Sequence, residues 1–375
     1  MKTTRLLLCT LGLALLGAAP VKAQNFGGLF YAVNLTINSS SATVDTVSDS
    51  VYPNGQGQIL RATKTGDTVI YKVPNIAACT YKVSVGMKKF PSRGQFQLSA
   101  SRADQNTYTN IGGVIDEYSS ASGGSFSEVT IGNWTPGTTN DKLFKFAVTG
   151  KNASSDQYWL SVDYIKLTPV GFAGIVSAAQ FKKMFPSANA FYTYAGLVQA
   201  CSTYPTFCTS GNATQNAQEA AAALANFAHE TGGLVYIREI QQSAYCSGNS
   251  TPCGVCASGQ EYYGRGPIQI SWNYNYCACG QAIGQPLWAN PELVATNSTI
   301  SWQTGLWYWM TQQGGYTQTP HQAILNGSFG GTIQAINGGV ECNGGNPAEV
   351  QDRINYYLEF LNILGVSAGS TATGC

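Results

Sequence analysis

Charged side chains are scarce in this chain. Lysine and arginine together number 20 and aspartate and glutamate 19, which gives a formal net charge of +1 at pH 7. Nucleic acids and anionic membranes attract proteins with a basic surplus, and this sequence has none. We therefore expect neither a nucleic acid nor a membrane as a partner. Abundant Gly, Tyr, Ser, Thr and Asn are typical of an extracellular, loop-rich protein that contacts polar, uncharged matter.

Histidine is rarer still, with only His229 and His321 in 375 residues. A His-Glu pair on a helix begins a zinc-protease motif, and His229 is followed by Glu230. That motif needs a second histidine one helical turn later, where this chain has Gly233. The sequence therefore excludes this kind of zinc site, and we expect no metal and no cofactor.

Long apolar runs are missing except near the N-terminus. Residues 6–16 form an apolar stretch that follows two basic residues, and residues 21–23 offer small side chains before a cleavage point. This pattern is typical of a secretory signal peptide over residues 1–23. The run is well short of the ~20 residues that a membrane anchor needs. We expect a secreted, monomeric protein whose mature chain begins at Gln24.

Cysteine is almost absent from the first half of the mature chain, where Cys79 stands alone. The chain has 11 cysteines, and loss of Cys9 with the signal peptide leaves ten. An even number in a secreted protein predicts disulfides. Cys253-Gly-Val-Cys256 and Cys277-Ala-Cys279 are similar to parts of zinc knuckles. The segment between them lacks the rest of such a pattern, so disulfides are the favoured interpretation.

The first half of the mature chain, residues 24–169, predicts β-structure. Short runs alternate apolar and polar residues, and turn residues such as Pro53-Asn-Gly and Pro136-Gly separate them. Period-two runs at this spacing predict an antiparallel β-sandwich. The expected strands are 68–73, 80–85, 95–99, 143–148 and 158–167.

Helical periodicity replaces this pattern after Pro169. Ser177-Ala-Ala-Gln180 is a capping box, which predicts the start of a helix. The junction is short and has no Pro/Ser-rich tract, so we expect two domains held close together, the second over 175–375. Further helices are expected over 215–231, closed by Gly232-Gly233, near 302–310 and over 348–364.

Two glutamates in this helical half are candidates for acid–base chemistry. Glu230 lies in the last turn of an Ala-rich helix, where burial and the negative end of the helix dipole favour a protonated carboxyl. A raised pKa is what a general acid requires. Glu239 follows nine residues later, and two carboxylates beside a cleft are the minimum for glycosidic cleavage. The plainer alternatives are a surface glutamate at 230 and a packing or hydrogen-bonding role for His229.

The segment Tyr262–Tyr276 is dense in aromatic and neutral polar side chains. Two glycines beside Arg265 indicate a tight backbone path, with the guanidinium fixed against a carboxylate. A sugar ring presents hydroxyls at its edge and C–H groups on its faces, so it suits amides, hydroxyls and rings together. An aromatic core strand would not explain four neutral polar groups in one run. The polar residues are Gln269, Ser271, Asn273 and Asn275, and the rings are Tyr262, Tyr263, Trp272 and Tyr274.

Residues 175–375 resemble the glycoside hydrolase family 19 chitinases along nearly their whole length. The resemblance implies a mainly α, lysozyme-like fold with a deep cleft. Gly232, where plant members have a second threonine, and the short spacing between the two acids look like the compact bacterial form. The segments that carry the resemblance are Phe191–Tyr194, Ala225–Gly233, Tyr262–Tyr276, Ala289–Val294, Thr304–Trp309, Ile336–Cys342 and Asp352–Ile354.

The resemblance also implies roles for individual residues. An inverting endo-chitinase would use Glu230 as general acid, Glu239 as general base and Ser271 to help hold the nucleophilic water. The implied disulfides are Cys342–Cys375 and Cys246–Cys256. Expected substrate-binding residues, including the charged ones of the cleft network, are His229, Tyr263, Gln269, Trp272, Tyr274, Asn275, Asn337, Glu341 and Arg353.

The strand-rich half is similar to galactose-binding-like jelly-roll modules appended to many secreted hydrolases. Trp134, Tyr158 and Trp159 either stack on sugar or belong to the sandwich core. Insoluble polysaccharide, chitin included, is the partner that such a module implies. For the helical half, the alternatives to a chitinase are a peptidoglycan hydrolase of the same fold and a non-catalytic chitin-binding lectin, although both acids are present. The segments of the strand-rich half that carry its similarity to galactose-binding-like modules are Lys88–Leu98, Asp116–Tyr118, Gly150–Ser154 and Asp163–Leu167.

Overall fold

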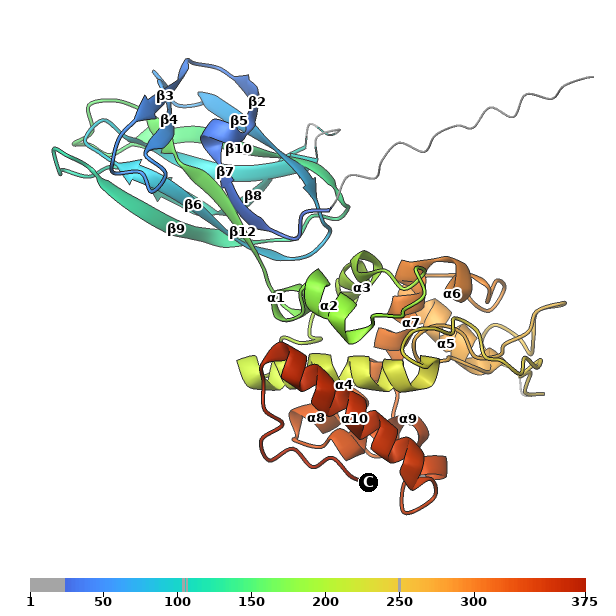
Figure 1. Cartoon of the computed structure of the whole chain (residues 1–375). Coiled ribbons are helices and arrows are strands. Elements are labelled where there is room, and N and C mark those ends of the chain that lie inside the picture. Colours follow the sequence, from blue (N-terminus) through green and yellow to red (C-terminus); the bar gives the residue numbers. More distant parts are fainter. Residues whose placement is uncertain (1–23, 103–104, 106, 249–250) are drawn as a thin grey trace, which may run out of the picture.

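The computed structural model describes residues 24–102, 105, 107–248 and 251–375. The predicted signal peptide lies outside these residues. Strands fill the chain up to Pro169, and every element from Phe172 onward is a helix. Figure 1 shows the two parts as separate lobes that meet where the last strand runs into the first helix.

The strand-rich part consists of antiparallel sheets, as the sequence predicts. One sheet has the order β2-β5-β10-β7-β8, a second β1-β12-β6-β9, and a short third β11-β4-β3. The strands are β1 (Gly28–Tyr31), β2 (Thr36–Ser40), β3 (Val44–Ser48), β4 (Gln56–Leu60), β5 (Thr68–Ile76), β6 (Tyr81–Lys89), β7 (Gly94–Arg102), β8 (Thr109–Asp116), β9 (Ser125–Trp134), β10 (Asn140–Lys151), β11 (Leu160–Val162) and β12 (Tyr164–Pro169).

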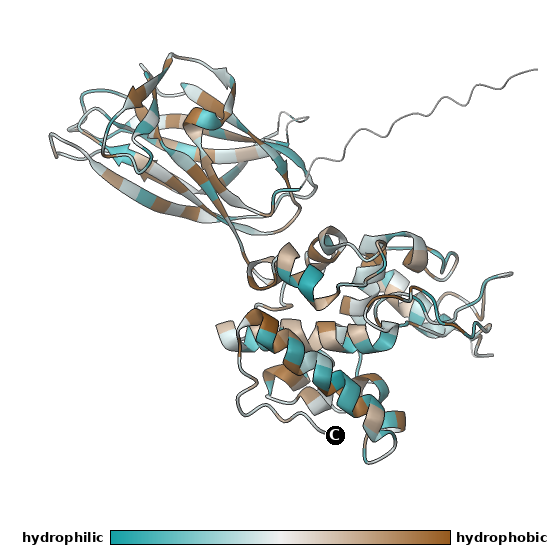
Figure 2. Cartoon of the chain, in the orientation of Figure 1, coloured by the Kyte–Doolittle hydropathy of each residue, from teal (hydrophilic) through white to brown (hydrophobic). Residues whose placement is uncertain are grey.

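Alternating burial explains why the central strands form. In β5, Val69, Tyr71 and Val73 are buried while the residues between them are partly exposed. The same alternation of apolar and polar residues is visible along many strands in Figure 2. Side chains of the two large sheets meet in the core, such as Trp134 of β9 and Phe144 of β10 with ring centroids 5.1 Å apart.

The five predicted strands are present, with one correction. The run 158–167 is not one strand: it divides at Asp163 into β11, which pairs with β4, and β12, which pairs with β6 and β1. Backbone bonds from Asp163 N to Gly86 O (2.8 Å) and from Ala32 N to Asp163 O (2.7 Å) hold this crossing point. Strands β1–β4, β8 and β9 were not predicted, because their sequences lack a clear apolar alternation.

The helical part is arranged around α4, which contacts α1, α8, α9 and α10. The capping box predicted at Ser177 is present at the start of α2. The helices are α1 (Phe172–Ile175), α2 (Ala178–Met184), α3 (Tyr194–Cys201), α4 (Ala213–Thr231), α5 (Asn273–Ile283), α6 (Leu293–Thr296), α7 (Ser298–Thr311), α8 (Pro320–Leu325), α9 (Phe329–Glu341) and α10 (Pro347–Leu364).

Helix α4 has well-defined ends. Asn212 caps its N-terminus by accepting a hydrogen bond from Gln215 N (3.0 Å), and the Gln215 side chain returns to Asn212 N. Gly232, in the left-handed conformation at φ 59°, ends it. Its alanines at 220–223 are buried and allow neighbouring helices to approach closely. The position of this C-terminus fixes where His229 and Glu230 lie.

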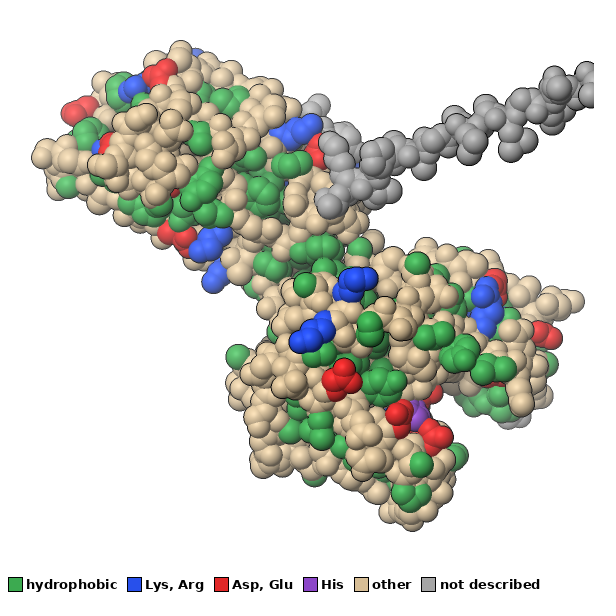
Figure 3. Space-filling model, viewed as in Figure 1, with side chains coloured by type: hydrophobic (Ala, Val, Ile, Leu, Met, Phe, Trp, Pro, Cys, Tyr) green, Lys and Arg blue, Asp and Glu red, His purple; other side chains and the backbone are tan. Residues whose placement is uncertain are grey.

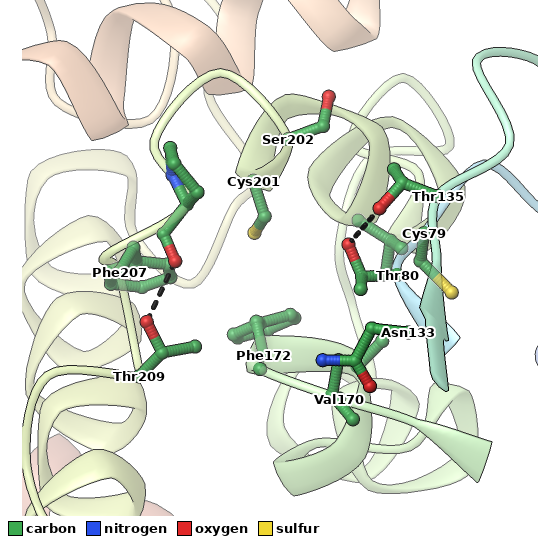
Figure 4. A pocket seen from close by; sticks show the side chains of 14 residues that line it. Cys79, Thr80, Asn133, Thr135, Val170, Phe172, Cys201, Ser202, Phe207 and Thr209 are labelled. Atoms are coloured by element: carbon green, nitrogen blue, oxygen red, sulfur yellow. Dashed lines mark hydrogen bonds between the residues drawn. The ribbon is translucent and has the colours of Figure 1, made fainter. Parts of the chain in front are cut away.

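The two parts contact each other directly, as the short junction predicts. Phe26 packs edge-on against Tyr194 with ring centroids 4.8 Å apart, and Val170 N donates to Thr80 O (3.0 Å). A cavity of about 320 Å³ lies at this junction. Figure 4 shows its lining residues, which come from both parts and include Cys79 and Cys201. None of the predicted catalytic or substrate-binding residues lines it.

Three disulfides are present among the described residues. Cys246–Cys256 and Cys342–Cys375 are the two that the resemblance implied, and Cys253–Cys277 is a third that was not predicted. Helix α3 ends at Cys201, so the backbone between Cys201 and Cys208 is not held in a helix, but these two cysteines are not bonded to each other. Cys79 and Cys279 are also free. In the same part of the chain, no helix is long and apolar enough to cross a membrane.

Candidate active site

Glu230 is held from behind by Arg353 of α10. The Arg353 Nη2 lies 2.5 Å from Glu230 Oε1, and the exposed fractions of the two side chains are 1% and 19%. Glu230 is therefore reachable from the surface while its positive partner is not. This contact joins the C-terminal turn of α4 to the first half of α10, two helices that pack along each other.

A buried network continues from Arg353 into α9. Its guanidinium donates to Glu341 through Nε (2.8 Å) and Nη2 (2.7 Å), and to Asn226 Oδ1 through Nη1 (3.0 Å). Asn337 Nδ2 donates to Glu341 Oε1 (2.8 Å). Burial opposes ionisation of Glu341, but Arg353 holds its pKa below the usual value. Because Arg353 and Glu341 are buried, the substrate contacts predicted for them are corrected to positioning contacts behind Glu230.

His229 is bound on both ring nitrogens by carboxylates of α10. Nε2 lies 2.9 Å from Glu349 Oε2, and Nδ1 lies 2.7 Å from Asp352 Oδ2. This favours the hydrogen-bonding role, since a sugar would have to replace one of these partners. Figure 3 shows one histidine with acidic side chains on both sides, at the edge of an indentation in the helical part.

Glu239 is anchored by the backbone of Gly264. Its N–H donates to Gly264 O (2.9 Å), and Gly264 N donates to Glu239 Oε2 (3.0 Å). Glycine is needed there, because a Cβ at 264 would lie 2.9 Å from Glu239 Oε2 and 3.0 Å from Gln269 Oε1. No described residue donates a hydrogen bond to Glu239 Oε1, which is shielded from solvent.

Arg265 is fixed against a carboxylate, as its flanking glycines predict. Its Nε lies 3.2 Å from Glu292 Oε2, and Arg238 pairs with the other oxygen of Glu292. Burial opposes ionisation of Glu292, but the two arginines hold its pKa below the usual value. The guanidinium carbon of Arg265 lies 3.6 Å from the centroid of the Tyr263 ring. Tyr263 is buried under this cation, so little of its predicted sugar-contacting face is free.

Trp272 and Tyr274 form an exposed aromatic surface. Their rings stack at 15° with centroids 6.1 Å apart, and their exposed fractions are 37% and 46%. Gln269 and Trp272 have positive φ angles of 48° and 73°, which non-glycine residues seldom adopt. Such conformations persist only where the surroundings enforce them, and they are enriched at functional sites.

Other residues of the Tyr262–Tyr276 segment have structural roles. Tyr262 is buried and its hydroxyl donates to Trp288 O (2.7 Å), so the expectation that its face meets a sugar is wrong. Asn273 is also buried, with Ser247 N donating to its Oδ1 (3.1 Å). Asn275 Nδ2 donates to Ser271 O (2.9 Å), which orients the backbone beside the Ser271 hydroxyl.

Several residues of the site were not predicted. Glu349 and Asp352 meet His229 across more than 100 residues of sequence, and Asn226 meets Arg353 at a similar separation. Nothing local in the sequence signals such pairs. The close backbone approach at Gly264 was predicted, because two glycines beside Arg265 indicate a tight backbone path.

The family model of chitinase class I matches residues 175–374. The match covers more than half of the chain and contains both glutamates and their partners.

The chain belongs to this family of glycoside hydrolases.

Individual relatives agree with this membership. An endochitinase of Arabidopsis thaliana is 46% identical over 181 residues, which cover 48% of this chain and 63% of that protein. An endochitinase of Phaseolus vulgaris is 38% identical over 235 residues, covering 54% and 71%. The crystal structure of chitinase C from Streptomyces griseus is 53% identical with a TM-score of 0.51, and covers 54% of this chain and 97% of that one.

The match is confined to the helical part. This chain spans less than two thirds of the length of the Arabidopsis relative, and its own strand-rich part lies outside the family match. The high identity to a bacterial enzyme agrees with the compact spacing of the two glutamates.

Arg353→Met should lower the free energy of unfolding by about 3–5 kcal/mol, because it leaves the buried Glu341 carboxylate without its cation. Chemical denaturation of the full chain measures the change. Arg61→Met is the matched control, since Arg61 pairs with Asp45 in a partly exposed salt bridge of 2.7 Å. Such pairs contribute about 0–1 kcal/mol. Equal losses in the two variants would contradict a structural role for the buried network.

Proposed function

We propose that this protein is a secreted endo-chitinase that hydrolyses β-1,4-linked N-acetylglucosamine polymers with inversion, using Glu230 as general acid and Glu239 as general base. The observation that carries this proposal is the different setting of the two carboxylates. Glu230 faces Arg353 at 2.5 Å, whereas Glu239 is held by a backbone N–H on one oxygen and has its other oxygen unbonded by any described residue.

The acid step uses the Glu230 and Arg353 pair. Protonated Glu230 gives its proton to the glycosidic oxygen as the bond from that oxygen to the anomeric carbon breaks. The product of this transfer is a carboxylate, and the guanidinium at 2.5 Å stabilises its negative charge. Glu341 and Asn226 hold the guanidinium in place, so it need not reorganise during the reaction.

The base step uses the free oxygen of Glu239. A water that reaches Oε1 in the reacting complex loses a proton to that oxygen as the water oxygen attacks the anomeric carbon from the opposite face. The Gly264 N–H fixes the carboxylate by binding Oε2. Ser271, whose backbone carbonyl is held by Asn275, is the residue that we assign to holding this water.

Sugar contacts are assigned to side chains that remain accessible around the two acids. The stacked rings of Trp272 and Tyr274 suit the apolar face of a pyranose. Gln269, Asn275 and Asn337 supply amide groups, although each uses one amide N–H internally.

Chitin is favoured over peptidoglycan because the relatives are named endochitinases and chitinase C. A purely lectin-like function is disfavoured because both acids are present with dedicated partners. Digestion of chitin oligosaccharides in parallel with bacterial cell walls separates the two enzymatic alternatives. Secretion is supported by the apolar N-terminal segment and by the disulfides.

For the strand-rich part we propose binding of insoluble polysaccharide. A cavity of about 200 Å³ is lined by the rings of Tyr52, Phe90 and Trp159 and by Arg93. Trp159 also lies under the Arg61 guanidinium, 4.0 Å from its ring centroid. By contrast, Trp134 packs between Tyr81 and Phe144, so it belongs to the core. Trp159 is therefore the aromatic residue that we assign to sugar contact.

Glu230→Gln should abolish turnover of a soluble chitin oligosaccharide, because an amide has no acidic proton to deliver, and the chain should stay folded, because Glu341 still pairs with Arg353. Glu239→Gln should slow the reaction by about 10²–10⁴, the usual contribution of general-base assistance. Ser271→Ala should cost less, since a hydroxyl only helps to position the water. A larger effect of Ser271→Ala than of Glu239→Gln would reverse the assigned roles.

The first product should be the α-anomer from a β-linked substrate. Direct attack by a held water inverts the anomeric carbon, and inverting enzymes generally place their carboxyls ~6.5–9.5 Å apart to make room for it. Proton NMR of products, recorded before mutarotation, measures the configuration. A β-anomer, or an adduct trapped on Glu239, would exclude single displacement.

Trp159→Ala in the full chain should lower activity on insoluble chitin and leave activity on soluble oligosaccharides unchanged. The reason is that the strand-rich part would bind the polymer more weakly while the helical part stays intact. Leu29→Ala, an exposed apolar residue of the same part, serves as the control. Equal activity of both variants on insoluble chitin would argue against sugar binding at Trp159.

A further inference from the structure

Tyr245 is held in a strained conformation next to the proposed base. Its φ is 43°, in the left-handed region, which costs a bulky residue on the order of 1 kcal/mol. Its ring packs edge-on against Trp272, with centroids 5.2 Å apart and planes at 87°. Trp272 is itself in a positive-φ conformation. Two strained aromatic residues therefore lie in contact at the cleft.

The segment that carries Tyr245 is fixed on several sides. Asn273 N donates to Tyr245 O (3.2 Å), and Tyr262 N donates to Ala244 O (2.9 Å). Immediately after Tyr245, Cys246 is bonded to Cys256, and the next disulfide ties Cys253 to Cys277 of α5. Although this segment has no regular secondary structure, these bonds place the Tyr245 side chain firmly. Such restraint explains how the strained backbone persists.

Tyr245 and Glu239 lie along the same stretch of backbone, since Tyr262 N donates to Ala244 O (2.9 Å) and Glu239 N donates to Gly264 O (2.9 Å). Burial raises the pKa of Tyr245, and the negative charge of Glu239 and the contact between the two side chains raise it further. Gly264 N occupies Glu239 Oε2 at 3.0 Å. Oε1 is shielded from solvent and receives no hydrogen bond from the described residues. A buried acceptor without a donor costs about 1–3 kcal/mol, and a phenol hydroxyl that donates a hydrogen bond to Oε1 would remove that cost.

We propose that Tyr245 is the positioning residue of the base: in the reacting complex its hydroxyl donates to Oε1 of Glu239 and aims the remaining lone pair at the attacking water. This inference rests on the proposed role of Glu239 as general base. Hydrogen bonds of this kind are often long in the free enzyme and tighten in the reacting complex. A sugar stacked on Trp272 contacts the same ring against which Tyr245 packs. Substrate binding and the orientation of the base are therefore coupled.

Tyr245→Phe is the direct test, because it removes the hydroxyl and keeps the ring on Trp272. Hydrolysis of a soluble chitin oligosaccharide by the full chain should show kcat reduced about tenfold and KM within about twofold of the parent value. Tyr245→Leu, which also removes the ring, should raise KM in addition. Tyr204→Phe, in the same helical part but outside the site, is the matched control and should leave kcat and KM unchanged.

A double-mutant cycle with Glu239→Gln distinguishes positioning from a general structural role. If Tyr245 acts through the carboxylate, Tyr245→Phe should change the residual rate of Glu239→Gln by less than about twofold. Persistence of the full tenfold effect in that background would overturn the proposal, as would a normal kcat for Tyr245→Phe alone. Normal activity of Glu239→Gln would instead overturn the proposed function itself, so the two failures are distinguishable.

Discussion

One buried guanidinium, that of Arg353, joins the three helices that form the floor of the site. It binds Glu230 and Asn226 of α4 and Glu341 of α9 from its own place on α10. Glu341 neutralises its charge, and Glu230 and Asn226 accept from its other N–H groups, as a buried arginine requires. The same contacts set the position of the proposed acid. Packing of these helices and the chemistry of Glu230 are thus not independent properties.

The opposite side of the site is built differently. Glu239 lies in irregular backbone, so its position comes from the Gly264 backbone, the clamp of Arg265 and Arg238 on Glu292, and two disulfides nearby. Strain is concentrated on this side, at Tyr245, Gln269 and Trp272. A helix holds the proposed acid, and a loop cross-linked by disulfides holds the proposed base.

The strand-rich part is fastened to the helical part by apolar contacts of its own, such as Phe26 on Tyr194. The family match stops short of this part. Its cavity at Trp159 and the two glutamates lie in different lobes, so the proposed sugar binding and the proposed hydrolysis can be tested by separate substitutions.

The sequence alone determined the class of each half, because period-two and helical runs set which faces become buried. Local motifs also predicted the C-terminal end of α4, the two glutamates and the Arg265 clamp, and the resemblance to the family implied two disulfides. Burial decided the rest. Tyr262 and Asn273 look like sugar contacts in the sequence but face inward, and Glu341 and Arg353 lie behind the site. His229 with Glu349 and Asp352, and Cys253 with Cys277, depend on how separate segments pack, and no local pattern encodes such pairs.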